Sequence, residues 1–197
     1  MKNVLVVIDM QNDFIDGPLG SKEAQAIVPN VVNKIREYRD AGHHIIFTKD
    51  THYYDYLESF EGKHLPVQHC IHGTDGWHIR EEIFDLFREY DDREDIFTCV
   101  QKSTFGTYVW GSKEFVAWAG ISIKEDGRIT PGLEYIGGSI EICGLCTDIC
   151  VVSNALILRS MYPQTDILVD SSCCAGVTPE KHEAALEVMR SCQIEVI

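Results

Sequence analysis

Residues 142–155 read Ile142-Cys143-Gly144-Leu145-Cys146-Thr147-Asp148-Ile149-Cys150-Val151-Val152-Ser153-Asn154-Ala155. The pattern predicts an apolar strand that breaks at a glycine, a turn, and a helix that carries Cys150 in its first turn. The positive end of the helix dipole and the unpaired backbone N–H groups lower the pKa of a thiol there and favour the nucleophilic thiolate. This placement indicates covalent catalysis, against the alternative of an inert, buried cysteine.

Short apolar strands and amphipathic helices alternate along the rest of the chain. Strands are predicted at residues 3–8, 44–48, 96–100, 139–143, 165–169 and 193–196. This alternation is typical of an α/β protein, and it predicts a three-layer α/β/α, Rossmann-like fold with a central, mostly parallel six-stranded sheet. The chain of 197 residues is expected to form one domain, residues 1–197.

Helices are predicted at residues 29–38, 79–90 and 112–118, after Cys150, and from residue 179 onward. Pro29 is expected near the first turn of the first of these helices, and Thr178 is expected to cap the last one. Residues 124–138, which are rich in glycine, are predicted to form an irregular excursion.

The composition restricts the partners. The chain has 17 basic and 31 acidic residues and a formal charge of −14, which argues against nucleic acid or an anionic membrane surface as the main partner. A small neutral or cationic ligand is expected instead, and we expect a homo-oligomer. No apolar run approaches the roughly 20 residues that span a bilayer, and the N-terminal segment lacks the features of a signal peptide. A cytoplasmic location is therefore expected.

The eight cysteines are expected to be reduced thiols, because no secretory signal accompanies them. Four of them offer an alternative from a different functional class. Cys143, Cys146, Cys173 and Cys174 could together bind zinc in a non-enzymatic, cysteine-rich module.

Reactive side chains follow four of the predicted strands. Asp9 follows the first strand, and Lys102 follows the third. Asp50 and His52 follow the second strand, and Cys150 lies in the turn after the fourth. Ligands of open α/β sheets bind at that edge. A carboxylate or an ammonium is costly at the end of an apolar strand unless it has a partner, and Asp9 and Lys102 can neutralise each other. A thiol nucleophile needs such a base and cation. The alternative is that Asp9 caps a turn and that Lys102 is solvated.

Histidines are concentrated after the second strand, at His52, His64, His69, His72 and His78. The carboxylate and imidazole of Asp50-Thr51-His52 are two residues apart, so both can point the same way. With His69 and one further group they would form a mixed nitrogen and oxygen site suited to Zn²⁺, Mn²⁺ or Fe²⁺. A solvated polar loop is the alternative.

Three motifs carry a family resemblance over nearly the whole chain. Residues Asp9-Met10-Gln11-Asn12-Asp13-Phe14, Lys102, and Gly144-Leu145-Cys146-Thr147-Asp148-Ile149-Cys150-Val151 resemble the motifs of isochorismatase-like cysteine hydrolases. The resemblance implies a non-proline cis peptide at Leu145–Cys146. Our hypothesis is that Asp9 takes the proton of the Cys150 nucleophile, that Lys102 stabilises charge, and that the backbone N–H groups of Cys146 and Cys150 form the oxyanion hole.

Residues 50–74 resemble the metal loop of the nicotinamidase branch of that family. The resemblance implies Asp50, His52 and His69 as metal ligands, with Glu58 at the fourth position and His64 as its competitor. One divalent ion is expected, Zn²⁺ first, with Mn²⁺ or Fe²⁺ as alternatives.

The implied activity is hydrolysis of nicotinamide to nicotinate and ammonia through a cysteine thioester, a reaction of NAD salvage. Phe14 and Phe105 are expected to line the substrate pocket. The principal alternative is a metal-free amidase of the same superfamily that acts on a carbamoyl or ureido substrate.

Overall fold

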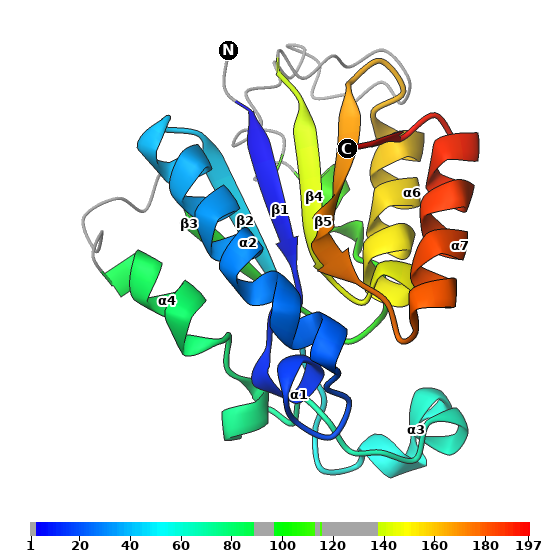
Figure 1. The fold of residues 1–197 in the computed structure, drawn as a ribbon. Coiled ribbons are helices and arrows are strands. Elements are labelled where there is room, and N and C mark those ends of the chain that lie inside the picture. The colour runs from blue at the N-terminus through cyan, green and yellow to red at the C-terminus, as the bar shows by residue number, and fades with distance from the viewer. Residues whose placement is uncertain (1–2, 89–96, 113–114, 116–137) are drawn as a thin grey trace.

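The computed structural model describes residues 3–88, 97–112, 115 and 138–197, and it contains one six-stranded sheet (Figure 1). Each predicted strand segment contributes a strand, although most boundaries shift by one or more residues. The strands are β1 Val4–Ile8, β2 His44–Asp50, β3 Phe97–Lys102, β4 Ile140–Leu145, β5 Ile167–Ala175 and β6 Glu195–Val196. Their order is β3-β2-β1-β4-β5-β6, and every neighbouring pair is parallel. The predicted α/β fold class is confirmed.

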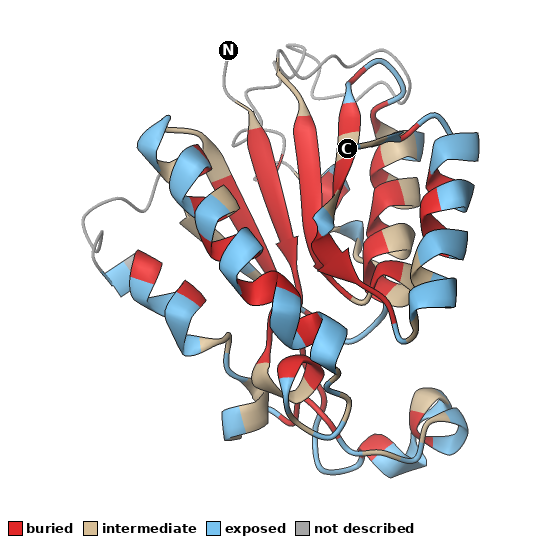
Figure 2. Ribbon diagram, viewed as in Figure 1, coloured by how far each residue is buried: buried red, intermediate tan, exposed pale blue. Residues whose placement is uncertain are grey.

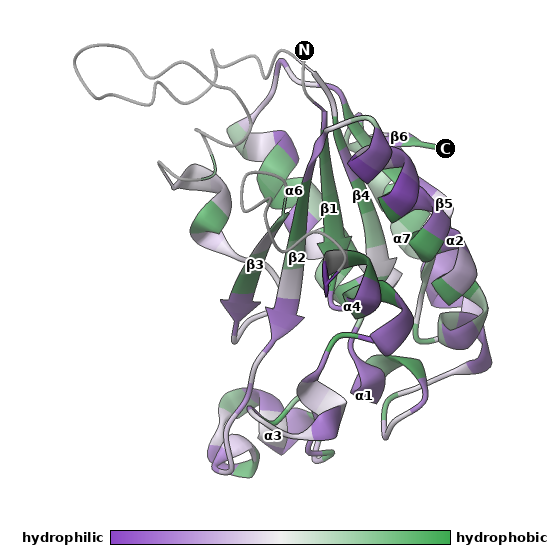
Figure 3. Cartoon of the chain, turned by 90° about the vertical axis from the view of Figure 1, so that its left-hand side faces the viewer, coloured by the Kyte–Doolittle hydropathy of each residue, from purple (hydrophilic) through white to green (hydrophobic). Residues whose placement is uncertain are grey.

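Helices cover both faces of this sheet. They are α1 Asn12–Ile15, α2 Lys22–Asp40, α3 Phe60–His64, α4 Glu81–Arg88, α6 Val152–Met161 and α7 Pro179–Ser191. Helices α2 and α4 lie on one face and α6 lies on the other, where it packs against α7 (Figures 1 and 3). Short helical turns lie at Tyr56–Glu58, Asp75–Trp77, Tyr108–Gly111 and Thr147–Val151, the last of which is a π-helical turn.

Of the two helix starts predicted from the sequence, at Pro29 and at Thr178, one is confirmed. Thr178 caps α7 by accepting a hydrogen bond from the Lys181 N–H, and Pro179 occupies the first helical position. The prediction for Pro29 is wrong, because α2 begins at Lys22 and encloses the proline. The Ser21 hydroxyl caps α2 by accepting from the Ala24 N–H, and the helix keeps its course past Pro29 because its apolar face is buried.

Two further predictions fall wholly or largely outside the described residues. The predicted helix at residues 112–118 and the irregular excursion at 124–138 overlap segments 113–114 and 116–137, which the structure does not describe. No helix within the described ranges combines the length and the apolar character needed to cross a bilayer.

The core lies on the central strands. All five residues of β1 are fully buried, as are most residues of the neighbouring strands (Figure 2). At its carboxyl end, β1 lies between β2 and β4, whose connections run in opposite directions along the sheet. Such a switch in strand order opens a crevice beyond the strand ends, which is where α/β proteins bind ligands.

Gly144 allows β4 to pass close to β1 at this point. Its φ is +119°, and a Cβ there would lie 2.0 Å from the Ile8 carbonyl oxygen. Only glycine adopts this conformation readily and leaves room for the neighbouring backbone. The turn after β4 is thereby brought next to Asp9, the residue that follows β1.

Candidate active site

A cavity of about 410 Å³ lies beyond the carboxyl ends of the central strands. Its size falls in the range of small-molecule sites, roughly 300–1,000 Å³. The predicted site residues that line it are Phe14, Asp50, His69, Phe105, Cys146 and Cys150. Apolar side chains that include Leu65, Leu145 and Ile149 complete the wall. A larger cavity of about 920 Å³, between α4 and the β2–β3 edge, is lined by none of the predicted site residues.

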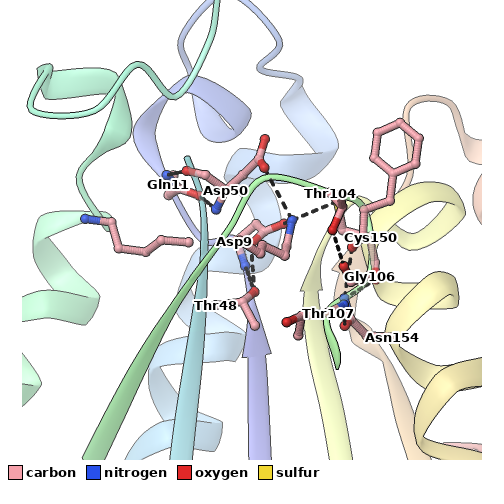
Figure 4. A network of polar contacts seen from close by, with 12 residues as sticks. Asp9, Gln11, Thr48, Asp50, Thr104, Gly106, Thr107, Cys150 and Asn154 are labelled. Atoms are coloured by element: carbon pink, nitrogen blue, oxygen red, sulfur yellow. Dashed lines mark hydrogen bonds and ion pairs between the residues drawn. The ribbon is translucent and has the colours of Figure 1, made fainter. Parts of the chain in front are cut away.

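Asp9, Lys102 and Cys150 meet beside this cavity. The Lys102 ammonium nitrogen lies 2.6 Å from Oδ2 of Asp9 and 3.5 Å from Sγ of Cys150. Lys102 therefore donates to the Cys150 sulfur while it is paired with the Asp9 carboxylate. Asp9 and Cys150 lie together beyond the strand ends in Figure 4. The structure therefore brings together an acid, a cation and a thiol that are up to 141 positions apart in the sequence.

Asp9 is held in an uncommon conformation. Its φ is +46°, in the left-handed region that few non-glycine residues adopt. Thr48 on β2 stabilises it, because the threonine hydroxyl donates to Oδ1 of Asp9 over 2.6 Å and accepts from the Asp9 N–H over 3.2 Å (Figure 4). This clamp directs the second carboxylate oxygen toward Lys102 and the thiol.

The electrostatics of this group correct one prediction. Burial and the nearby Asp9 carboxylate raise the pKa of the Cys150 thiol, so the predicted lowering by the helix start is wrong. Burial also raises the pKa of Asp9, against the opposing effect of Lys102. Although burial disfavours the ammonium, the Asp9 carboxylate gives Lys102 a pKa above its ordinary value. The resting site is thus a neutral thiol beside an ammonium that is paired with the Asp9 carboxylate.

A second cluster of side chains lies beside Asp9, Lys102 and Cys150, at the end of β2 and in the loop that follows it. Oδ2 of Asp50 is 3.0 Å from Nε2 of His52 and 3.4 Å from Nε2 of His69. All three side chains are buried, and one ligand atom from each lies within 4.8 Å of the others. Nδ1 of His69 is 2.8 Å from the Val67 carbonyl oxygen, so it carries the proton there and leaves Nε2 free to coordinate.

This donor set fits a divalent ion. Two imidazole nitrogens and a carboxylate that converge on one point form the mixed first shell typical of Zn²⁺, Mn²⁺ or Fe²⁺. Burial opposes ionisation of Asp50, but the nearby His52, His69 and Lys102 side chains hold the pKa of Asp50 below its ordinary value. The carboxylate is therefore ready to bind a cation.

The structure places Glu61 beside the histidines and does not bring the predicted Glu58 or its competitor His64 to them. Oε1 of Glu61 lies 3.8 Å from Nε2 of both His52 and His69, and Glu61 lines the cavity. Glu58 is exposed in the turn before α3, and His64, at the end of α3, is exposed with Nδ1 against the Phe60 carbonyl oxygen. Three positions separate Glu58 from Glu61, and the extended residue Ser59 and the start of α3 at Phe60 lie between them.

Two residues of the motif at positions 9–14 hold the loop of residues 50–74 in place, a role that the sequence analysis did not assign. The Gln11 side chain accepts from the Asp50 N–H over 2.7 Å and donates to the carbonyl oxygens of Asp50 and Trp77. Oδ2 of Asp13 accepts from the Cys70 N–H over 2.7 Å, next to His69. The motif as a whole was the available signal, since its polar residues recur at every second position after a buried strand.

The two predicted aromatic residues both border the cavity. Phe14 is buried, with its ring centroid 5.4 Å from that of His69. Phe105 follows β3, is 48% exposed and lines the same cavity as Cys150. The predicted cis peptide at Leu145–Cys146 is also present.

The alternative of a four-cysteine zinc module is wrong. Within the described ranges, Asp50, His52 and His69 are the only group of three or more histidine, cysteine and acidic side chains whose ligand atoms converge. Cys143 lies inside the sheet, and Cys173 and Cys174 are neighbours on β5. Successive side chains of a strand point to opposite faces, so these two thiols do not approach one ion together.

Comparison with known families agrees with this geometry. The model of the isochorismatase domain matches residues 3–197. The chain belongs to the isochorismatase family. It is 26% identical over 205 residues to the nicotinamidase/pyrazinamidase of Mycobacterium tuberculosis, covering 98% of this chain and 97% of that protein.

Two solved structures of this family share the fold. The nicotinamidase/pyrazinamidase PncA from Bacillus subtilis superimposes with a TM-score of 0.78 at 24% identity, covering 100% of this chain and 99% of that one. The pyrazinamidase of Pyrococcus horikoshii, solved in complex with zinc, gives a TM-score of 0.73 at 23% identity, with 100% and 99% covered.

Proposed function

We propose that this isochorismatase-family protein is a nicotinamidase, which hydrolyses nicotinamide to nicotinate and ammonia through a thioester on Cys150. One observation carries the proposal. The Lys102 ammonium lies 2.6 Å from the Asp9 carboxylate and 3.5 Å from the Cys150 sulfur, beside a small-molecule cavity that also adjoins the convergent Asp50, His52 and His69 cluster. The first group suits amide cleavage, and the second suits recognition of a heteroaromatic ring.

Proton transfer begins at the Cys150 thiol, which lies beside Lys102 and its partner Asp9. Asp9 accepts the thiol proton and becomes neutral as sulfur attacks the amide carbon, and Lys102 stabilises the negative charge that develops on the sulfur. The backbone N–H groups of Cys146 and Cys150 would hold the developing oxyanion. Asp9 returns its proton to the amide nitrogen, which leaves as ammonia when the C–N bond breaks. Asp9 then activates the water that hydrolyses the thioester to the carboxylic acid and regenerates the thiol.

Asp50, His52 and His69 would hold the ion, with Glu61 beside them. When bound, the ion supplies a Lewis-acid contact for the ring nitrogen of the substrate. We propose Zn²⁺, because two imidazoles with carboxylates suit it and the pyrazinamidase of similar fold was solved with zinc. Phe14 and Phe105 would then contact the faces or edges of the ring.

The substrate assignment draws on the relative from Mycobacterium tuberculosis, whose name gives nicotinamide and pyrazinamide as its amides. A metal-free amidase acting on carbamoyl or ureido substrates would leave the buried Asp50, His52 and His69 cluster without a purpose. Ammonia release from nicotinamide by the zinc-loaded protein, and its loss on chelation, tests the proposal. Turnover of ureido substrates alone, unaffected by a chelator, would overturn it.

A nucleophile variant sharpens this test. Cys150→Ala is expected to reduce ammonia release by about 10⁴-fold or more, because no other group replaces the sulfur. Its zinc content should equal that of the parent protein, since the ligands come from β2 and the following loop. Cys192→Ala is the matched control, because Cys192 is an exposed cysteine at the end of α7. Comparable activity in the two variants would contradict the role of Cys150.

We further propose a single domain over residues 1–197, a cytoplasmic location, and a homo-oligomer that acts without nucleic acid or membrane. The net charge of −14 supports the absence of polyanionic partners. Light scattering on the purified protein measures the oligomeric state, and a monomer would contradict that part of the proposal.

A further inference from the structure

One buried side chain joins the two segments that form the nucleophile side of the cavity. Asn154 lies on α6, four positions after Cys150, and is fully buried. Its Nδ2 donates to the Cys150 carbonyl oxygen over 2.8 Å and to the Phe105 carbonyl oxygen over 3.1 Å. Its Oδ1 accepts from the Thr107 N–H over 3.1 Å and from the Trp110 indole N–H over 2.9 Å.

These four contacts use the whole hydrogen-bonding capacity of a carboxamide, which has two N–H donors and two acceptor lone pairs. The partners also determine its orientation, because two carbonyls require donors and two N–H groups require an acceptor. An aspartate at this position has no donor for the two carbonyls, and an apolar side chain serves none of the four. The site therefore requires asparagine specifically.

The loop that Asn154 holds is part of the cavity wall. Residues 103–107 connect Lys102 to the turn Tyr108–Gly111 and include Phe105. Gly106 in this loop lies against α6, because a Cβ there would be 2.5 Å from Cδ1 of Ile157. In Figure 4, Asn154, Thr107, Gly106 and Cys150 lie together on one side of Asp9. The Asn154 side chain thus holds both this loop and the Cys150 backbone through its hydrogen bonds, and we call it the anchor.

We infer that Asn154 is a positioning residue that sets the distance between the Phe105 wall and the Cys150 sulfur, and so determines how tightly the substrate ring is held. This inference rests on the proposed function. Asn154 contacts no reacting atom, so it acts through Phe105 and the backbone of Cys150. The consequence is that its loss weakens substrate binding more than it slows the chemical step.

Steady-state kinetics with nicotinamide test the inference. Asn154→Asp keeps the size of the side chain but leaves two buried carbonyls without donors, so KM is expected to rise about ten-fold. The value of kcat per reactive thiol, counted by iodoacetamide titration, should change less than about three-fold. Thr104→Val is the control, because it removes only the hydrogen bond from Thr104 to the Gly106 carbonyl oxygen in the same loop. A drop in kcat with unchanged KM would indicate a merely structural role and overturn the inference.

A double-mutant cycle isolates the route through Phe105. In a Phe105→Ala background the wall is already absent, so Asn154→Asp should raise KM by less than about two-fold. An undiminished ten-fold rise in that background would overturn the inference.

Hydrogen exchange separates this inference from the proposed function. If the parent protein releases no ammonia from nicotinamide, the proposed function fails, and the anchor is then read from exchange of the Thr107 amide and the Trp110 indole N–H. Both should exchange slowly in the parent protein and at least about ten-fold faster in Asn154→Leu, with the Thr104→Val variant unchanged. Equal exchange rates in the parent protein and Asn154→Leu would overturn the anchor itself.

Discussion

Replacement of Gly144 by alanine tests how the sheet positions the reacting side chains. The added Cβ would lie 2.0 Å from the Ile8 carbonyl oxygen and 2.8 Å from two further backbone atoms of Ile8. No side-chain rotation relieves a clash with backbone inside a sheet. The strands must separate by about 1 Å, since real Cβ atoms essentially never approach closer than 3.0 Å.

The magnitude follows from two costs. Overpacking in a core costs roughly 1–3 kcal/mol, and a non-glycine residue in the positive-φ region costs roughly 1–2 kcal/mol more. The free energy of unfolding should therefore fall by about 2–5 kcal/mol. Because Asp9 follows Ile8 directly, strand separation also moves the carboxylate away from Cys150. A misplacement of about 1 Å is expected to lower kcat about 100-fold.

Urea denaturation and ammonia release measure these two effects on the same preparation. Gly42→Ala is the matched control, because Gly42 also has a positive φ, +69°, but its added Cβ would meet no atom within 4 Å. It should lose only about 1–2 kcal/mol and keep its activity. Equal destabilisation in the two variants, or near-normal kcat in Gly144→Ala, would refute the reasoning.

Two further predictions concern acidic side chains. Glu61→Gln should weaken zinc affinity about ten-fold in a chelator competition, whereas exposed Glu58→Gln should leave it unchanged; equal effects would contradict the placement of Glu61. Burial opposes ionisation of Asp170, but hydrogen bonds from Ser172 and the ion pair with Lys34 lower the pKa of Asp170 below its ordinary 3.8. This carboxylate therefore stabilises the fold above about pH 4, and that contribution is lost as the pH falls through the lowered pKa. Asp170→Asn should flatten part of the decline in urea midpoint between about pH 5 and pH 3, and an unchanged slope would contradict this.

The layout of the sheet was predictable because each strand is a short apolar run bounded by polar or turn residues. Buried parallel strands have this pattern wherever they lie in the chain, so local sequence suffices to find them. The start of α2 was not predictable in the same way. Proline is common at the first position of helices, which is why the sequence predicts a helix start near Pro29. Burial of the apolar face of α2 instead extends the helix back to Lys22, with Ser21 as its cap.

The sequence by itself determined which chemical groups stand at the strand ends: a carboxylate at Asp9, an ammonium at Lys102 and a thiol at Cys150. Their order along the chain and the parallel sheet place all three at one edge. Only the tertiary structure decided that the thiol is neutral at rest and that Glu61, not Glu58, faces the histidines. A pKa depends on burial and on charges brought close from distant segments, and the direction of a side chain in an irregular loop depends on the backbone that holds it. Neither quantity is encoded within a few residues of the group concerned.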